Sequence, residues 1–227
     1  METRTVRSVL CYGDSNTYGQ TSADRPAERF GPTERWPGIM RGLLGPEWMV
    51  IEEGLSGRTT VSDDPIEGEI RNGRRYLAPC LLSHRPIDAL ILMLGTNDLK
   101  VRFNKPASEI AMGVRVLIED IRGLGVNRLG VMPEVILVSP PPTRRDLGGW
   151  EPVFSGGHEK SLQLAAEYEK VADAMEVHFF DAGSAVTGYA EDGFHLDLKG
   201  HAELGEAMAR QVELIGWAPL APARPAG

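Results

Sequence analysis

The sequence has few cysteines and no long apolar run, and each shortage excludes a class of protein. Its two cysteines among 227 residues, Cys11 and Cys80, lack the spacing of a zinc site or a redox pair. We interpret both as small core residues in a reducing compartment. No segment reaches the roughly 20 apolar residues that cross a bilayer, and none reads as a signal-peptide core. These absences predict a cytoplasmic protein that does not act in a membrane.

Positive charge is also scarce. The chain has 24 Lys and Arg against 32 Asp and Glu, a net charge of −8, which argues against a nucleic-acid surface and against anionic membranes. Arg71, Arg74 and Arg75 form the densest basic cluster, and we interpret it as a solvated loop or helix face. The histidines show no HExxH or similar spacing, so we expect no metal or other cofactor.

The composition that is present is ordinary for a globular protein, with 42% apolar and 25% charged residues. A chain of this length is large enough to bury one sizeable core. We therefore predict a single α/β domain over residues 1–217. Residues 218–227 are rich in proline and alanine, and we expect a disordered tail there.

Short apolar runs alternate with longer helix-like segments along the chain. The predicted strands are Ser8–Tyr12, Met49–Glu52, Ala89–Leu94, Val135–Val138 and Val177–Phe180. The predicted helices are Trp36–Leu44, Arg74–Leu82, Ala107–Leu124, Glu159–Ala174 and Leu198–Ile215, the last with Asp197 as N-cap. This alternation predicts a five-stranded parallel sheet in a three-layer α/β/α, flavodoxin-like sandwich.

Two predicted loops, residues 21–35 and 140–157, are too long to be simple connections. The second carries Trp150, Val153 and Phe154, whose apolar side chains need something to cover them. We predict that these three residues wall a substrate pocket or an oligomer interface.

Four short polar segments follow predicted strands or precede the last helix, the edge at which open α/β sheets bind ligands. They are Gly13-Asp14-Ser15-Asn16, Gly54-Leu55-Ser56-Gly57, Gly95-Thr96-Asn97-Asp98 and Asp192-Gly193-Phe194-His195. Together they supply a nucleophile, a base, a carboxylate and hydrogen-bond donors, which is the set of groups that acyl transfer through a serine requires.

Each of these residues also has a simpler interpretation. Ser15 opens a helical turn with its hydroxyl exposed and its N–H directed at a developing anion, but it would equally suit a plain N-cap. The Asn97 amide can donate to an oxyanion, or close an Asx-turn. Gly57 lets a substrate approach the backbone and offers its N–H, or is an ordinary turn glycine.

His195 and Asp192 carry more weight because of their spacing. A three-residue offset lets the Asp192 carboxylate reach Nδ1 of His195 while Nε2 faces Ser15. The simpler interpretation is a surface histidine after an Asp-Gly turn. Asp181 is a rival carboxylate, but it is explained by a turn or cap ahead of Ala182-Gly183-Ser184.

These four segments resemble the SGNH hydrolases, the GDSL-type esterase and lipase family, over roughly Ser8 to Ile215. Further stretches resemble the bacterial arylesterase/acyltransferase (perhydrolase-like) subgroup. They are Glu52-Glu53-Gly54-Leu55-Ser56, Arg58-Thr59-Thr60, Met93-Leu94-Gly95-Thr96-Asn97-Asp98, Val138-Ser139-Pro140-Pro141-Pro142 and Phe180-Asp181-Ala182-Gly183-Ser184.

The resemblance implies that Ser15 is the nucleophile, His195 the general base and Asp192 the residue that orients it. It implies an oxyanion hole formed by the N–H groups of Ser15 and Gly57 and by the Asn97 amide. Members of the subgroup form compact oligomers, often octamers, so the resemblance also implies a homo-oligomer whose contacts narrow an apolar channel.

The chain departs from the family pattern at a few positions. Asn16 replaces the leucine of the first block, a position that we expect not to touch the chemistry. Tyr18 and Gln20 stand where acyltransferase members carry larger aromatic side chains, which favours hydrolysis over acyl transfer.

We therefore predict a serine esterase that cleaves small acetyl-like esters, with acyl transfer to alcohols or peroxide as an added activity. A carbohydrate acetylesterase is the alternative within enzymes. A non-catalytic anion- or nucleotide-binding flavodoxin-like module is the alternative from another class, although it leaves Asn97, Asp192 and His195 without a role.

Overall fold

The computed structural model describes residues 6–217, so the predicted disordered tail at 218–227 lies outside the described residues. Five parallel strands form one sheet in the order β2-β1-β3-β4-β5. Their bounds are β1 Arg7–Gly13, β2 Trp48–Gly54, β3 Ala89–Met93, β4 Glu134–Ser139 and β5 His178–Asp181. This is the flavodoxin-like order, so the predicted fold class is confirmed.

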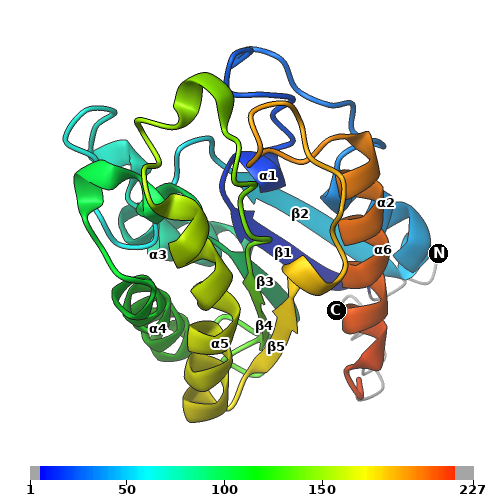
Figure 1. Ribbon diagram of the computed structural model, residues 1–227. Helices are drawn as coiled ribbons and strands as arrows, with labels where there is room; N and C mark the ends of the chain where they lie inside the picture. The colour runs from blue at the N-terminus through cyan, green and yellow to red at the C-terminus, as the bar shows by residue number, and fades with distance from the viewer. Residues whose placement is uncertain (1–5, 218–227) are drawn as a thin grey trace, which may run out of the picture.

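Helices cover both faces of the sheet (Figure 1). Besides the short α1 (Ser15–Tyr18), they are α2 Trp36–Leu44, α3 Gly73–His84, α4 Ala107–Leu124, α5 Gly157–Met175 and α6 Leu198–Leu214. Helices α3, α4 and α5 pack on one face and α2 and α6 on the other (Figure 1). Within residues 6–217, none of these helices is long and apolar enough to span a bilayer.

The core lies on both sides of the sheet, because successive side chains of a strand point to opposite faces. Leu10 and Tyr12 of β1 join the cluster under α3, α4 and α5, whereas Val9 and Cys11 join the cluster under α2 and α6. Burial on both faces explains why β1 and β3 read as continuous apolar runs rather than alternating ones. Cys80 is also fully buried, as expected of a core residue.

The predicted helix ends agree with the structure where a cap is visible in the sequence. Asp197 caps α6, its carboxylate accepting from the Gly200 N–H at 2.8 Å. Helix α3 begins earlier and ends later than the predicted Arg74–Leu82. Its earlier start follows from Asn72, which caps the helix by accepting from the Arg74 N–H at 3.0 Å. The first turn has room only for glycine at position 73, because a Cβ there would clash with the Thr59 carbonyl oxygen at 2.6 Å.

The carboxyl ends of the strands meet at one edge of the sheet, where α1 lies close to the ends of β1 and β2 (Figure 1). The approach is very close, since a Cβ on Gly54 would lie 2.1 Å from the Tyr18 nitrogen. Only glycine fits at this point. The loop after β2 and the turn after β3 therefore open beside Ser15, the first residue of α1.

Candidate active site

Ser15 lies at the first position of α1, directly after the end of β1. Asp14 caps this helix, its Oδ1 accepting from the Asn16 N–H at 3.0 Å. As the first helical residue, Ser15 has no intrahelical acceptor for its own N–H. The Ser15 hydroxyl reaches a cavity, although the residue as a whole is only 6% exposed.

The Ser15 hydroxyl meets His195, which lies 180 residues later in the loop before α6. Nε2 of His195 is 2.9 Å from Oγ of Ser15. On the other side of the ring, Nδ1 is 2.7 Å from Oδ2 of Asp192. The structure thus brings Ser15, His195 and Asp192 into one continuous hydrogen-bonded chain. Asp181, the rival carboxylate, instead caps a turn by accepting from the Gly183 N–H at 2.8 Å.

Backbone donors hold Asp192 in place. Its Oδ1 accepts from the His195 N–H at 2.9 Å, and its Oδ2 accepts from the Ala23 N–H at 2.6 Å. Burial alone would raise the pKa of Asp192, but the hydrogen bond and charge of His195 together with these donors lower it to about 2. The carboxylate is therefore ionised at any working pH. Ala23 belongs to the long loop 21–35, which therefore contacts the site through Asp192.

The pKa of Asp14 shifts in the opposite direction to that of Asp192. Burial raises the pKa of its carboxyl to about 6, although the donated Asn16 N–H works against that shift. Above pH 6 the folded protein therefore holds a charged group that would be better solvated in the unfolded chain. Below pH 3.8, the ordinary value, the group is protonated in both states and this penalty disappears.

Asp14→Asn should consequently stabilise the protein at pH 8 and give no gain below about pH 4. The amide keeps an acceptor for the Asn16 N–H and removes the buried charge. The two pKa values differ enough for a gain of up to about 3 kcal/mol in the free energy of unfolding. Urea unfolding of both proteins at pH 8 and at pH 4 measures it. An equal difference at the two pH values would show that the Asp14 charge is not responsible.

Asn97 and Gly57 approach the same cavity from two neighbouring segments. Asn97 opens a 3-10 turn, Asn97–Leu99, after β3, and its Nδ2 donates to the Arg58 carbonyl at 3.1 Å. One Nδ2 hydrogen is thus fixed by the loop after β2, and the amide has a second hydrogen to offer. Gly57 has a φ of 78°, and a Cβ there would lie 2.7 Å from Oε2 of Glu67. The left-handed φ is what favours glycine here, since the Glu67 side chain could move to make room for a Cβ.

Asn97→Ala should lower kcat on a small ester by roughly 10²–10³, the usual loss for one oxyanion donor, with KM little changed. The amide would contact the oxygen of the substrate only once negative charge develops on it. Steady-state hydrolysis of p-nitrophenyl acetate measures both constants. Wild-type kcat in a folded Asn97→Ala protein would remove Asn97 from the oxyanion hole.

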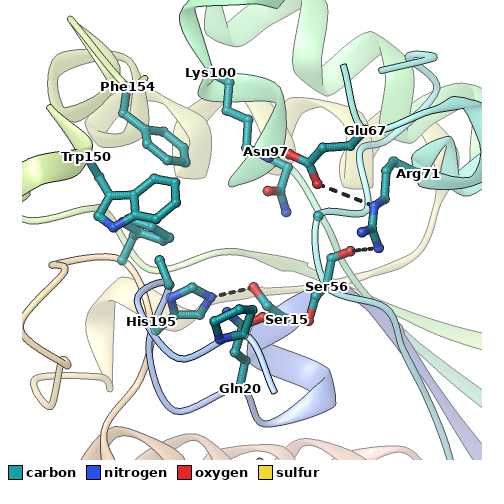
Figure 2. A pocket seen from close by; sticks show the side chains of 14 residues that line it. Ser15, Gln20, Ser56, Glu67, Arg71, Asn97, Lys100, Trp150, Phe154 and His195 are labelled. Carbon is teal, nitrogen blue, oxygen red and sulfur yellow. Dashed lines mark hydrogen bonds and ion pairs between the residues drawn. The ribbon is translucent and has the colours of Figure 1, made fainter. Parts of the chain in front are cut away.

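The cavity above Ser15 has a volume of about 280 Å³ and two chemically different walls. Figure 2 shows Trp150 and Phe154 on one side, and Glu67 and Arg71 across from them, with Ser15 and His195 between. Phe194 joins the aromatic wall, with its ring 4.7 Å from that of Phe154 and 4.6 Å from that of His195.

Of the three residues predicted to wall the pocket, Trp150 and Phe154 line the cavity and Val153 does not. The Val153 side chain packs against the core on the α5 side, and its carbonyl accepts from the Val101 N–H at 2.8 Å. The predicted pocket role is therefore wrong for Val153, whereas a role in an oligomer interface stays a prediction. Adjacency in the sequence could not separate Val153 from Trp150 and Phe154, because it does not show which side chains face the cavity.

Charged residues on the opposite wall were missed by sequence reasoning. Nζ of Lys100 lies 2.8 Å from Oε1 of Glu67, and Nε of Arg71 lies 3.3 Å from the same carboxylate. Arg71 also donates to the Ser56 carbonyl at 2.5 Å. The prediction of a solvated basic face fits the half-exposed Arg74 and Arg75 but not Arg71, which lines the cavity. No motif signals this network, because it depends on packing between two separate loops, the one after β2 and the one after β3.

Asn16 was predicted not to touch the chemistry, and it does not line the cavity, but its side chain contacts the backbone beside His195. Its side-chain Nδ2 donates to the Phe194 carbonyl at 3.0 Å, and its Oδ1 accepts from the Leu196 N–H at 2.9 Å. These two backbone groups flank His195. The sequence could not reveal a contact between residues so far apart in the chain.

The described residues also contain one group of side chains close enough to hold a metal ion. The ligand atoms of Glu53, Cys80 and His84 all lie within 4.8 Å of one another. Sequence spacing could not show this group, because Glu53 lies on β2 and the other two residues lie on α3. Burial, followed by the charge of Glu53, raises the pKa of the Cys80 thiol to about 12. Nε2 of His84 is 2.8 Å from Oε1 of Glu53, so a hydrogen bond already accounts for that pair.

The sequence profile of the GDSL-like lipase/acylhydrolase family matches residues 11–203, a span that contains Ser15, Gly57, Asn97, Asp192 and His195. The chain belongs to the GDSL-like lipase/acylhydrolase family. It is a carboxylic ester hydrolase of the SGNH type. No curated protein sequence matches the chain.

Several solved structures have folds similar to that of this chain. The aryl esterase of M. smegmatis superposes with a TM-score of 0.86 at 41% identity, over 92% of this chain and 99% of that one. Est24, a carbohydrate acetylesterase from Sinorhizobium meliloti, superposes with a TM-score of 0.85 at 41% identity, over 91% and 98% of the chains. A lipase/acylhydrolase from Enterococcus faecalis shares the fold at 20% identity, over 92% and 96% of the chains, with a TM-score of 0.64.

Proposed function

We propose that this esterase cleaves short-chain, acetyl-like esters through a covalent acyl-enzyme on Ser15. The contacts from Oγ of Ser15 to His195 and from His195 to Asp192 carry this proposal. A nucleophile within hydrogen-bond reach of a base, itself held by a third group, is the geometry of serine acyl transfer.

In the first half of the reaction, Oγ of Ser15 attacks the ester carbonyl while Nε2 of His195 takes its proton. Asp192 is ionised because its pKa is lowered to about 2, and its negative charge stabilises the imidazolium that forms. The N–H groups of Ser15 and Gly57 and the Asn97 amide stabilise the oxyanion. The tetrahedral intermediate collapses, His195 returns the proton to the alcohol oxygen, and the alcohol leaves.

In the second half, a water molecule takes the place of the alcohol. His195 removes its proton, the water oxygen attacks the acyl carbon, and Ser15 leaves with the proton returned by His195. An alcohol or peroxide that reached the acyl-enzyme would react in the same way and give a new ester or a peracid. Gln20 lines the cavity as a polar group, which favours the entry of water.

The small volume and the aromatic wall of the cavity support a short acyl group. At about 280 Å³ the space lies at the lower limit of ligand pockets. Trp150, Phe154 and Phe194 leave little room for a long chain beside His195.

A carbohydrate acetate is the second candidate substrate. Glu67, Arg71 and Lys100 on the wall across from Trp150 offer acceptors and donors to a leaving group rich in hydroxyls. Est24, at 41% identity, is a carbohydrate acetylesterase, which adds weight to this choice of leaving group. The catalytic steps are unchanged, so the two candidates differ only in the alcohol released.

Hydrolysis of p-nitrophenyl acetate, butyrate and octanoate by the wild type and Ser15→Ala tests the proposal. Ser184→Ala is the matched control, because the Ser184 hydroxyl donates to the Asp181 carbonyl away from the cavity. We expect turnover that falls steeply beyond butyrate, disappears in Ser15→Ala and persists in Ser184→Ala. Benzyl acetate formed on addition of benzyl alcohol would add acyl transfer. Octanoate hydrolysed as fast as acetate would contradict the short-chain assignment.

A further inference from the structure

We propose that Asn16 is a positioning residue that holds His195 at hydrogen-bonding distance from Ser15. This inference rests on the proposed function, in which Ser15 and His195 exchange a proton. It concerns the residue directly after Ser15, at which the chain departs from the leucine that gives the GDSL pattern its name.

The contacts of Asn16 span His195 from both sides. The amide donates to the carbonyl before His195 and accepts from the N–H after it, at 3.0 and 2.9 Å. One amide thereby satisfies two backbone groups. Its nitrogen donates to the carbonyl before His195, and its oxygen accepts from the N–H after it. Two such bonds fix the position and the rotation of this segment more firmly than one would.

Asn16 is well placed to transmit this constraint to Ser15. The two residues are neighbours on α1, and Asp14 accepts from the Asn16 N–H at 3.0 Å. Asn16 is only 2% exposed and His195 only 3%, so water has little access to these bonds. The amide therefore ties the short helix carrying the nucleophile directly to the loop carrying the base.

Apart from its contact with Ser15, the hydrogen bonds of His195 are made within its own loop. Asp192 orients the imidazole ring through Nδ1, and the His195 carbonyl accepts from the Ala190 N–H at 2.9 Å. Both partners belong to the same loop as His195. They shape this loop but do not set its distance from α1, whereas the Asn16 amide spans the two segments.

Leucine at this position could not act in the same way. It would leave the Phe194 carbonyl and the Leu196 N–H without their partner in a buried place, which is costly. The loop would have to move to find other partners. A displacement of about 1 Å between reacting groups can cost about 10²-fold in rate.

The test compares Asn16→Leu and Asn16→Ala with the wild type in p-nitrophenyl acetate hydrolysis. Both substitutions remove the two hydrogen bonds, but one enlarges the side chain and the other shrinks it. We expect kcat to fall roughly 10- to 100-fold in both, with KM within about threefold of wild type, because Asn16 does not line the cavity. If Asn16→Leu does not fold, Asn16→Ala decides the matter.

Asn127→Leu is the matched control. Its amide also bridges backbone groups, with Oδ1 accepting from the Val131 N–H at 3.0 Å and Nδ2 donating to the Met132 carbonyl at 3.2 Å. It lies between α4 and β4, at the opposite edge of the sheet from Ser15. We expect this variant to lose thermal stability while kcat stays within about twofold of wild type.

Three results would overturn the proposal. Wild-type kcat in folded Asn16→Leu and Asn16→Ala would show that His195 needs no help from Asn16. A loss in kcat matched by Asn127→Leu at equal loss of Tm would reduce Asn16 to a structural residue. A loss seen only in Asn16→Leu would point to crowding rather than to hydrogen bonds. Failure of the proposed function shows separately, as a wild type whose ester turnover is absent or independent of Ser15.

Discussion

Ser15→Ala should lower kcat/KM for p-nitrophenyl acetate by about 10⁶, because the members of a serine triad act as a unit. The substitution removes only the hydroxyl that contacts Nε2 of His195 at 2.9 Å. No acyl-enzyme can then form, and water has to attack the ester directly. Any remaining rate comes from binding and from the oxyanion donors.

Steady-state rates over a range of enzyme concentrations measure this loss, and Tm checks that the variant is folded. We expect Tm close to that of the wild type, since the deleted atom makes no contact that supports the core. A loss of tenfold or less in the folded protein would mean that another group, or a metal-bound water, performs the attack.

Asp192→Asn should lower kcat by about 10⁴ while leaving KM nearly unchanged. The single asparagine oxygen can still accept from the His195 N–H, whereas the amide nitrogen replaces the oxygen that accepts from the Ala23 N–H. The asparagine cannot stabilise the imidazolium, and it favours the wrong tautomer of His195. Asp192 has a pKa of about 2, so the carboxylate that the substitution removes is ionised throughout pH 6 to 9.

Asp181→Asn provides the control for Asp192→Asn, since Asp181 was the rival carboxylate in the sequence. Its oxygen accepts from Ser139 and Gly183, away from His195. We expect Asp181→Asn to retain nearly all activity. The assignment of Asp192 would be wrong if the two substitutions lowered kcat to the same degree, or if Asp181→Asn alone did so.

The fold could be predicted from local patterns because each pattern has a local cause. The buried run Leu90 to Leu94 identifies a strand covered on both faces, and Asp197 identifies the start of α6. Helix α3 was placed less well, because Asn72 was not recognised as its cap. The contacts among Ser15, His195 and Asp192 agree with the expected geometry, since their segments follow strand ends or precede the last helix.

Other features of the site could not be predicted, because they depend on where loops meet. Val153 is close to Trp150 and Phe154 in the sequence, but it packs against the core and does not line the cavity. Glu67 and Lys100 are 33 residues apart and meet only in the folded chain. Asn16 meets the residues around His195 across 180 positions. Periodicity and spacing carry no information about such contacts.

Covalent labelling with a serine-directed organophosphate, followed by mass mapping of the peptides, tests the central claim most directly. The account predicts one adduct per chain, located on Ser15, with loss of ester hydrolysis in proportion to labelling. It also predicts no labelling of Ser15→Ala. An adduct on another residue that abolishes activity, or full activity in a chain labelled on Ser15, would contradict the proposed mechanism.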